Sequence, residues 1–509
     1  MITIVDFGSQ YTQLIARRIR ALQVFSRVVS CRDSKEEILR NNPQGLILSG
    51  GPSSVYEANS PTLPVELVEE LNIPVLGICY GHQLLMKLLG GKIERGGTGE
   101  YGRATATMKS DNVLLSGIPK ELHVWMSHRD HVAELPVGFV SLATSPGTPN
   151  CIVSSPNRHI WGLQFHPEVH HTEHGTRILE NFVFDICSCR RDWSLGDWID
   201  TTCNEIREQA GNRRVVSAVS GGVDSTVMAT LLDRALGKQS EHVFVDNGLL
   251  RANEREEVDH ALRVVLGLNL QVVDASADFL AQLVGITDPE EKRARIGRQF
   301  IHTFFRNVES KDLLAQGTLY PDVIESVSVR GPSDKIKTHH NRVPEIMKMI
   351  EEGRVVEPLK ELFKDEVREV GRLLDIPAHL LERYPFPGPG LAIRVLGEVT
   401  PERLDLLRKA DLIFREEIAA DPQSYKRVWQ GFAVLLPVKA VGVMGDSRTY
   451  ASVCAIRAVE SVDGMTADWA RLPYELLDRI SRRIVNEVVG INRVVYDISS
   501  KPPGTIEWE

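Results

Sequence analysis

The sequence lacks several features that define whole classes of protein. No apolar run in its 509 residues approaches the roughly 18 residues that a membrane-spanning helix needs, and the first residues are typical of a strand rather than a secretion signal. The seven cysteines fit neither a disulfide framework nor a zinc-binding spacing. We therefore expect a cytoplasmic protein with reduced thiols and no membrane partner.

An excess of positive charge is missing as well. The formal net charge is −9, which argues against non-specific binding of nucleic acid through its phosphates. No internal repeat or low-complexity segment interrupts the chain, and its content of 42% hydrophobic and 25% charged residues is ordinary for globular proteins. On length alone, about three globular domains are expected.

Two regions, 1–190 and 191–385, alternate short apolar runs with helical patterns. Runs such as 45–48 and 74–78 are continuously apolar, which is typical of parallel strands covered on both faces. A helix over 198–209 opens the second region. Its expected strands cover 214–219, 241–245 and 269–272. Each region therefore predicts an α/β domain with a doubly wound parallel sheet.

A third region, 386–509, follows a run of turn-forming residues. Residues 384–390 are rich in proline and glycine and cannot form a helix or a central strand. Helical patterns then mix with strand patterns. The expected helices cover 402–419 and 473–489, and the expected strands cover 434–438 and 493–498. We expect a smaller α+β domain here.

Cys79 lies in the sequence Gly77-Ile-Cys-Tyr-Gly81, between an apolar run and a helical pattern. A strand, a tight turn and a helix in this order predict a nucleophile elbow, in which glycines tolerate a strained backbone. The positive end of the following helix would favour the reactive thiolate. The alternative is an inert core cysteine, which the flanking glycines make the poorer interpretation.

His166 and Glu168 supply the groups that a thiolate nucleophile needs. His166 follows an expected strand over 160–165, and Glu168 stands two residues later, beyond a proline that stops strand pairing. The carboxylate could hold one imidazole nitrogen while the other faces the cysteine. A structural or surface histidine is the alternative.

These motifs resemble the catalytic set of the class I glutamine amidotransferases. Further matching runs are Asp6-Phe-Gly-Ser-Gln10 and Leu48-Ser-Gly-Gly-Pro52, so the resemblance covers about residues 1–190. It implies that Cys79 attacks the amide of glutamine and releases ammonia, with His166 as base and then acid and Glu168 as its orienter. It also implies an oxyanion hole formed by Gly51 and Tyr80.

A second motif predicts a phosphate-binding loop. The sequence Val215-Val-Ser-Ala-Val-Ser-Gly-Gly-Val-Asp-Ser-Thr226 is strand, glycine loop and helix, but it lacks the lysine of a Walker A motif. It resembles the loop of the N-type ATP pyrophosphatases, which adenylate an oxygen and release pyrophosphate with Mg²⁺ present. The resemblance implies ATP binding by Ser220, Gly221, Gly222, Val223, Asp224, Ser225 and Thr226, with the magnesium ligands left open.

Two other residues are weaker candidates for ATP binding. Asp246 ends the next expected strand at the family's adenosine side, although an ordinary turn or helix cap explains it equally well. Lys360 and Lys364 lie one helical turn apart in a helix that we expect to begin near 357, which suits a polyphosphate. A solvated helix face explains these lysines about as well.

The third region resembles the family of glutamine-hydrolysing GMP synthetases. The matching sequences are 388–394, 436–446 and 500–509. The resemblance implies amination of XMP with glutamine and ATP, and a homodimer formed by a third domain that completes the XMP site. The residues it implies at that site are Arg293, Gln430, Arg483, Lys501, Thr505, Ile506 and Glu507. Solvated surface charge is the alternative for the two arginines.

Residues 335–341 resemble the family's lid over ATP, although 341–345 depart from the usual pattern. A histidine-rich stretch over 170–174 is expected to be a solvent-facing loop rather than a metal site. Rival functions are another adenylating synthetase, such as NAD synthetase, and a non-catalytic nucleotide-binding protein. The intact Cys79 motif argues against the latter.

Overall fold

The structure is a computed structural model that describes residues 1–57, 59–64, 67–68, 72–320, 344–444, 447–461 and 466–509. The chain divides into two compact units. One contains residues 1–198 and the segment that begins at 319, and the other contains 199–318 and 339–509. Among the described residues, no helix combines the length and the apolar character needed to cross a membrane. The α/β fold class predicted from the sequence is confirmed.

A nine-stranded sheet forms the centre of the first unit, with strand order β2-β1-β3-β4-β9-β8-β7-β5-β6. The first five strands in this order are parallel: β2 (Ser26–Ser30), β1 (Ile2–Asp6), β3 (Gly45–Leu48), β4 (Val75–Ile78) and β9 (Ile160–Leu163). Every residue of β1, β3, β4 and β9 is buried, as their continuous apolar sequences predict. The helices of this unit are α1 (Thr12–Ala21), α2 (Lys35–Ile38), α4 (Tyr80–Leu88) and α5 (Gly175–Glu180).

The rest of this sheet is antiparallel, which the sequence analysis did not predict. Its strands are β8 (Thr148–Ser155), β7 (Val140–Ser145), β5 (Lys92–Met108) and β6 (Glu121–Glu134). Strand β6 alternates buried and exposed residues along most of its length, because only one of its faces is covered. The parallel half therefore extends into an antiparallel half that carries long strands.

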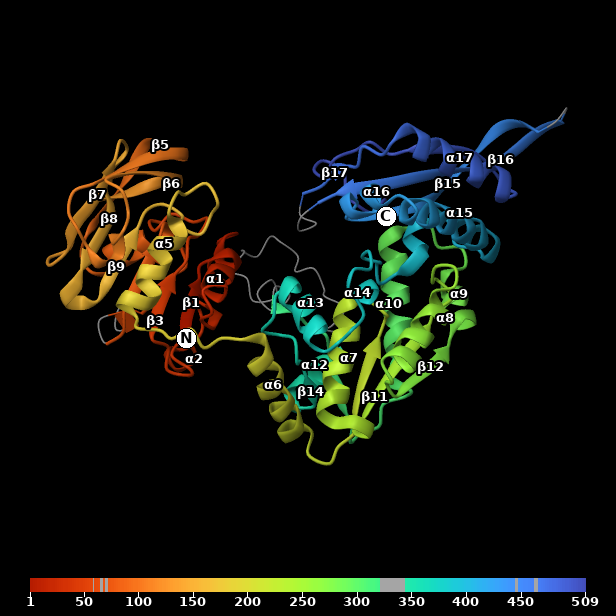
Figure 1. Cartoon of the computed structure of the whole chain (residues 1–509), viewed down its shortest axis with the longest axis horizontal. Coiled ribbons are helices and arrows are strands. Elements are labelled where there is room, and N and C mark those ends of the chain that lie inside the picture. Colours follow the sequence, from red (N-terminus) through yellow and green to blue (C-terminus); the bar gives the residue numbers. More distant parts are fainter. Residues whose placement is uncertain (58, 65–66, 69–71, 321–343, 445–446, 462–465) are drawn as a thin grey trace. The chain divides into compact units, whose positions relative to one another are not determined.

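The second unit begins with a five-stranded parallel sheet of order β12-β11-β10-β13-β14. The strands are β10 (Val215–Val219), β11 (Ser240–Asp246), β12 (Leu270–Asp274), β13 (Leu313–Ala315) and β14 (Val355–Val356). The accompanying helices are α6 (Leu195–Ala210), α7 (Val223–Leu236), α8 (Glu254–Asp259), α9 (Ser276–Leu283), α10 (Pro289–Phe305), α12 (Pro344–Glu351), α13 (Lys364–Leu373) and α14 (Ala378–Leu381). Figure 1 shows α7 and α10 beside strand β11.

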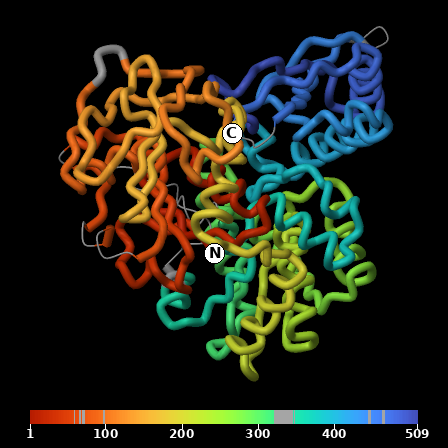
Figure 2. The backbone as a smooth tube through the Cα atoms, turned by 60° about the vertical axis from the view of Figure 1, so that its left-hand side comes forward, coloured from red at the N-terminus to blue at the C-terminus, as the bar shows by residue number. Residues whose placement is uncertain are grey.

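A mostly antiparallel sheet lies in the C-terminal part of the same unit. Strand β16 (Ser447–Glu460) pairs with β15 (Gln430–Met444), β17 (Asp468–Trp469) and, in parallel, β18 (Ile491–Tyr496). Helices α15 (Pro401–Ala419), α16 (Pro422–Arg427) and α17 (Tyr474–Glu487) accompany it. Helix α15 begins sharply because the Thr400 side chain accepts a hydrogen bond from Arg403 N and a proline occupies the first turn. Figure 2 follows the backbone through this part to the C-terminus.

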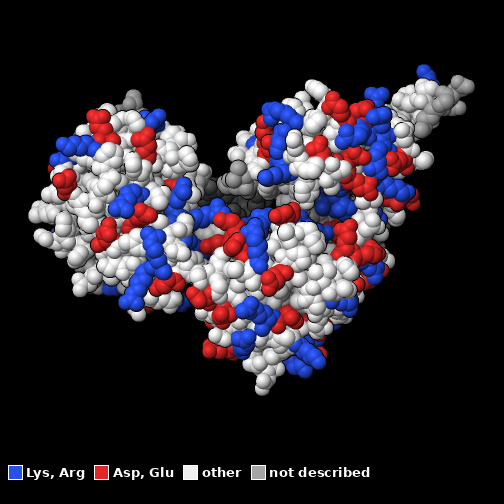
Figure 3. All heavy atoms as spheres, in the orientation of Figure 1, with Lys and Arg blue, Asp and Glu red and all other residues white. Residues whose placement is uncertain are grey.

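One hydrophobic core joins the two sheets of the second unit. It contains Val216 and Val243 from the parallel sheet, Leu391 from the segment between the sheets, and Phe414 and Ala433 from the C-terminal part. This shared core explains why 199–318 and 339–509 form one compact unit, although the pattern changes near residue 385. A separate core fills the first unit. Figure 3 shows lysines and arginines interspersed with acidic residues over the visible face.

Candidate active sites

Cys79 occupies a sharp turn between β4 and α4. Its backbone has φ 51° and ψ −103°, a conformation that is unusual for any residue with a side chain. Its N–H donates to Leu163 O at 2.7 Å, which fixes the turn against β9. The flanking glycines are needed because a Cβ at Gly77 would lie 2.7 Å from His82 N, and one at Gly81 would lie 2.4 Å from Leu48 O. The turn has the geometry of the predicted nucleophile elbow.

His166 and Glu168 form a buried pair. The Nδ1 atom of His166 lies 2.7 Å from Glu168 Oε1, and the two side chains are 4% and 0% exposed. Arg18 Nε donates to Glu168 O at 3.0 Å and so fixes the backbone of the carboxylate residue. Burial alone would lower the pKa of the His166 imidazole, but Glu168 and Cys79 outweigh it and hold that pKa well above its usual value.

A cavity of about 650 Å³ opens over Cys79. Gly51 and Tyr80 line it together with the cysteine, and a Cβ at Gly51 would lie 3.3 Å from Tyr80 Cγ, so the two oxyanion-hole candidates lie side by side. The structure thus brings every amidotransferase candidate of the sequence analysis to one end of the parallel strands. A cavity of this size and lining can admit a small amino-acid substrate.

Sequence reasoning missed the residues that the antiparallel strands bring to this cavity. Gln83 of α4 lines it and donates to Asp130 O at 2.6 Å. His128 of β6 lines it as well, with its Nε2 atom 3.5 Å from Glu100 Oε2. Burial lowers the pKa of His128, while Glu100 opposes that shift. The alternation of apolar and polar residues along β6 was the available signal.

The histidine-rich stretch after Glu168 is exposed, as expected. His170, His171 and His174 all have exposed side chains. Across the part of the chain that the structure describes, no group of three or more histidine, cysteine or carboxylate side chains is placed to hold a metal ion.

The segment Ser220–Thr226 follows β10 and runs into the first turn of α7, and its polar atoms are held by internal hydrogen bonds. Ser225 Oγ accepts from Ser220 N at 3.2 Å and donates to Gly222 O at 3.0 Å. Gly221 has φ +73°, and a Cβ there would lie 2.4 Å from Val258 Cγ2, so the loop requires glycine. Helix α7 begins at Val223, and its positive end therefore lies directly behind the glycines of the loop.

The structure separates the two weaker ATP candidates. Asp246 ends β11, where its Oδ1 accepts from Gly248 N at 2.9 Å and its Oδ2 lies 3.2 Å from Arg255 Nη1. The expected helix near Lys360 is wrong: Lys360 lies in a turn, and α13 begins only at Lys364. The reason is local capping, since Glu366 accepts from Phe363 N at 2.9 Å.

Lys364 rather than Lys360 reaches the phosphate loop. Its Nζ atom lies 3.9 Å from Asp224 Oδ2. The two lysines do not share a helix face, so the i, i+4 argument for them does not apply. The expected lid, residues 335–341, lies outside the described residues, as do residues 445 and 446 of the motif at 436–446.

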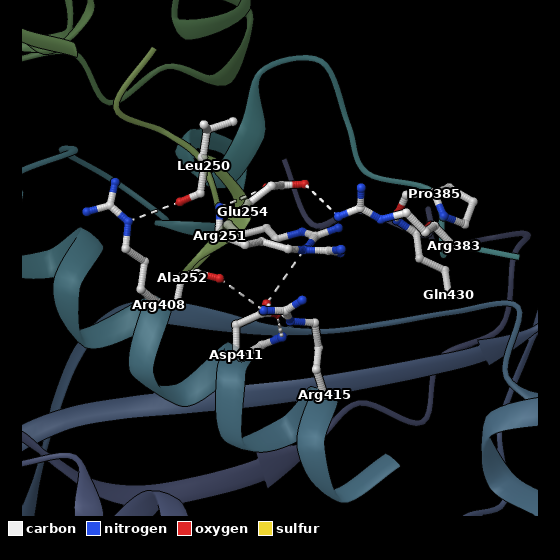
Figure 4. A network of polar contacts seen from close by, with 12 residues as sticks. Leu250, Arg251, Ala252, Glu254, Arg383, Pro385, Arg408, Asp411, Arg415 and Gln430 are labelled. Atoms are coloured by element: carbon white, nitrogen blue, oxygen red, sulfur yellow. Dashed lines mark hydrogen bonds and ion pairs between the residues drawn. The ribbon is translucent and has the colours of Figure 1, made fainter. Parts of the chain in front are cut away.

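A buried ion network joins the loop after β11 to helix α15 (Figure 4). Asp411 of α15 is 1% exposed and lies 3.6 Å from Arg251 Nε and 3.3 Å from Arg415 Nε. Burial lowers the pKa of Arg251 to about 10, and Asp411 opposes that shift. Arg383 of the same network also donates to Gly221 O in the phosphate loop at 3.2 Å.

Most XMP candidates meet at the end of the chain. Gln430 Nε2 donates to Glu507 Oε1 at 2.8 Å, and Arg293 Nη2 donates to Glu509 O at 2.5 Å. The carbonyls of Thr505 and Ile506 both accept from Arg457, at 2.8 Å.

Two other candidates have different surroundings. Lys501 pairs with Ala467 through the backbone, and Ala467 packs in one cluster with Ile506. Arg483 of α17 instead lies 3.0 Å from Glu417 and Glu416 and 2.7 Å from Glu487. The structure therefore groups Lys501 with the C-terminal residues, whereas Arg483 contacts carboxylates of helices α15 and α17.

Comparison with known proteins gives matches along the whole chain. Residues 3–186 match the family described as glutamine amidotransferase class-I, 197–292 match NAD synthase, and 416–508 match the GMP synthase C terminal domain. The glutamine-hydrolysing GMP synthase of Aquifex aeolicus is 56% identical over 513 residues, which cover 100% of this chain and 99% of the relative. Those of Thermosynechococcus vestitus and Thermotoga maritima are each 52% identical across 100% of this chain and 96% and 100% of the relatives.

Proposed function

The chain belongs to the family of glutamine-hydrolysing GMP synthases, and from that membership we propose how its residues divide the work. The protein is a ligase that aminates XMP to GMP with glutamine as nitrogen donor. XMP, ATP, glutamine and water give GMP, AMP, pyrophosphate and glutamate. The proposed division assigns ammonia release to the first unit and the activation and amination of XMP to the second.

In the first unit, Cys79 is the proposed nucleophile. Its thiolate attacks the amide carbon of glutamine, a C–S bond forms, the C–N bond breaks, and His166 delivers the proton that leaves with ammonia. Water then hydrolyses the thioester with His166 as base. Two observations support this: the 2.7 Å contact between His166 and Glu168, and the raised pKa of His166, which suits an imidazolium–thiolate pair.

Gly51 and Tyr80 are the proposed oxyanion-hole residues. Both line the cavity above Cys79, and Tyr80 is the first residue of α4, where backbone N–H groups lack helical partners. Backbone donors at a helix start can stabilise a tetrahedral oxyanion without reorganising during the reaction.

In the second unit, the loop Ser220–Thr226 is the proposed site for the ATP phosphates. An oxygen of XMP attacks the α-phosphorus, pyrophosphate leaves, and ammonia then displaces AMP from the activated carbon. The start of α7 behind the loop favours this assignment. Asp246 remains a proposed adenosine contact, and Lys360 is proposed only as a nearby cation.

Mg²⁺ is proposed to enter with ATP. The described residues offer no group of three protein ligands, which fits an ion held by one or two carboxylates together with substrate phosphates. Asp224, in the first turn of α7, is the carboxylate that we propose as such a ligand. When bound, the ion would neutralise charge on the departing pyrophosphate.

We also propose that the chain has three domains, at 1–190, 191–385 and 386–509, and that the protein is cytoplasmic. The third domain is proposed to form a homodimer. Exposed apolar side chains support the dimer, because Val443, Tyr450 and Ile498 are 73%, 66% and 63% exposed in this domain. Light scattering on the purified protein tests it. A monomer at micromolar concentration would contradict it.

The decisive experiment for the division of labour uses Cys79→Ala. This variant should lose GMP formation from glutamine and retain it from ammonium salts, because the thiolate only supplies ammonia. Cys151→Ala is the matched control, since Cys151 is a fully buried cysteine of the same unit that does not line the cavity. Loss of both activities in a folded Cys79→Ala protein would contradict the proposal. Detection of ADP and phosphate, in place of AMP and pyrophosphate, would contradict adenylation.

A further inference from the structure

Three cationic side chains in the second unit are completely buried, and all three bind the last residues of the chain. Lys292, Arg394 and Arg457 are 0% exposed, and no other lysine or arginine among the described residues reaches that value. Each of them has at least one partner within 497–509. Burying a cation is costly unless it is paired, so three such groups aimed at one segment indicate that its position matters.

Arg457 and Lys292 bind residues on either side of Glu507. Arg457, from β16, donates to the carbonyls of Thr505 and Ile506 at 2.8 Å, just before Glu507. Lys292, from α10, binds the Glu509 carboxylate just after it and also donates to Val395 O at 2.8 Å. The C-terminal end lies beside α10 in Figure 1. Arg293 also donates to Glu509 O at 2.5 Å, so backbone carbonyls are held both before and after Glu507.

Arg394 fixes the side chain of Glu507. Arg394 Nε donates to Glu507 Oε2 at 3.0 Å and Nη2 donates to Oε1 at 2.8 Å, which is a bidentate pair. Gln430 Nε2 donates to Oε1 at 2.8 Å. A carboxylate can accept about four hydrogen bonds. Three hydrogen bonds are made to protein groups, so the Glu507 carboxylate can accept one more, through Oε2.

Two aromatic rings hold the Arg394 guanidinium in turn. Its central carbon lies 4.0 Å from the Phe432 ring centroid and 5.2 Å from that of Phe386. Arg251 contacts the same Phe386 ring at 4.3 Å, and Arg251 belongs to the network of Figure 4 that reaches α15. Cation–π contacts of this kind stabilise a desolvated guanidinium. Arg394 is therefore held at fixed orientation before any ligand binds.

We propose that Arg394 is a positioning residue for the acceptor nucleotide: it holds the Glu507 carboxylate so that one oxygen can accept a hydrogen bond from an N–H or O–H group of XMP. This inference rests on the proposed function, in which Glu507 approaches the nucleotide. Arg394 acts through Glu507 and takes no part in bond making. A mispositioned carboxylate would weaken binding of XMP and leave ATP binding and glutamine hydrolysis in place.

Steady-state kinetics on Arg394→Met and Arg394→Lys test the proposal. Truncating one partner of a buried hydrogen-bonded charge pair should raise the KM for XMP by about 30-fold or more, while kcat at saturating XMP and the KM for ATP change by less than about 3-fold. Arg394→Lys should fall between Arg394→Met and wild type, because lysine keeps the charge and loses the fork. Equal changes in all three constants would overturn the proposal.

Arg214→Met is the matched control. Arg214 also binds two carboxylates, Asp312 at 2.6 Å and Glu241 at 2.8 Å, but it precedes β10, at the end of that strand opposite the phosphate loop. Its loss should lower thermal stability and leave the KM for XMP unchanged. A matching rise in that KM would show that general destabilisation explains the Arg394 result.

Glu507→Gln and the double variant separate this inference from the function it rests on. If wild type forms no GMP from XMP, the proposed function fails. If Glu507→Gln raises the KM for XMP and Arg394→Met does not, only the positioning role fails. The two substitutions should be strongly non-additive, because they remove one pair. If Arg394→Met does not fold, Phe386→Leu decides: a selective rise in the KM for XMP supports the proposal, and an unchanged KM overturns it.

Discussion

Replacing Gly81 by alanine should displace Cys79, the proposed nucleophile, without contacting it. An added Cβ would lie 2.4 Å from Leu48 O and 2.7 Å from Leu48 Cβ, whereas ordinary contacts begin near 3.4 Å. The obstacle is the backbone of β3, which is fully buried and cannot rotate away as a long side chain could. Helix α4 must therefore retreat by about 1 Å, and it takes Cys79 with it.

A displacement of this size has two measurable costs. Overpacking a buried contact lowers the free energy of unfolding by about 1–3 kcal/mol. A misplacement of about 1 Å between reacting groups can cost about 100-fold in rate. We expect kcat/KM for glutamine hydrolysis to fall by about 100-fold in Gly81→Ala, with GMP formation from ammonium salts nearly unchanged because the phosphate loop belongs to the other unit.

The assay is glutamate release measured beside ammonia-dependent GMP formation, with thermal unfolding as the check on folding. Gly196→Ala is the control, because a Cβ at Gly196 would have only one neighbour within 4 Å, Ser194 Oγ at 3.9 Å. Wild-type glutamine hydrolysis in a Gly81→Ala protein of wild-type stability would refute the argument that the approach of α4 to β3 sets the position of Cys79.

Two further predictions concern buried titratable groups. Burial lowers the pKa of His82 to about 3, and an unfolded histidine titrates near 6.5, so between these pH values only the unfolded state binds the proton. As the pH falls from ~6.5 toward ~3, the free energy of unfolding of wild type should therefore decrease by about 1.4 kcal/mol per pH unit more than that of His82→Leu. Acid-unfolding curves that run in parallel for the two proteins would contradict this expectation. Asp411→Ala should lower the free energy of unfolding of the second unit by about 3 kcal/mol, because Arg251 stays buried without its carboxylate, and Arg415→Met should cost less since Arg415 is partly exposed. Calorimetry measures the free energy of unfolding of the Asp411→Ala and Arg415→Met proteins, and glutamine hydrolysis checks that the first unit is intact in each. Equal losses in the two variants would contradict the burial argument.

The parallel strands and the turn that carries Cys79 could be predicted from the sequence because their signals are local. Continuous apolar runs gave β3 and β4 within one residue, and the elbow around Cys79 combines a strand, paired glycines and a helix. The antiparallel half of the first sheet was harder. Strand β5 contains Gly96, Gly97 and Gly99, and its pairing with β6 shifts register across that stretch, so its sequence is typical of a loop.

In the second unit, sequence patterns could not predict the buried arginines or their partners. Arg394 and Arg457 occupy fully buried positions that a hydrophobic pattern assigns to apolar residues. Their partners lie 113 and 49 residues away in the chain, at Glu507 and Ile506, so no spacing rule connects them. The prediction of a helix that contains Lys360 was wrong because a cap at Phe363 sets the start of α13 at Lys364.

The distribution of cysteines has a practical consequence for chemical labelling. All seven cysteines are unpaired and buried. Burial raises the pKa of the six cysteines other than Cys79, which are Cys31, Cys151, Cys187, Cys189, Cys203 and Cys454. These six thiols are protonated at neutral pH and react slowly with electrophiles. Of the seven cysteines, only Cys79 lines the 650 Å³ cavity. The native protein thus carries a single addressable thiol, so an alkylating reagent or a glutamine-shaped warhead should give one adduct per chain and serve as an active-site titrant without any cysteine being engineered away.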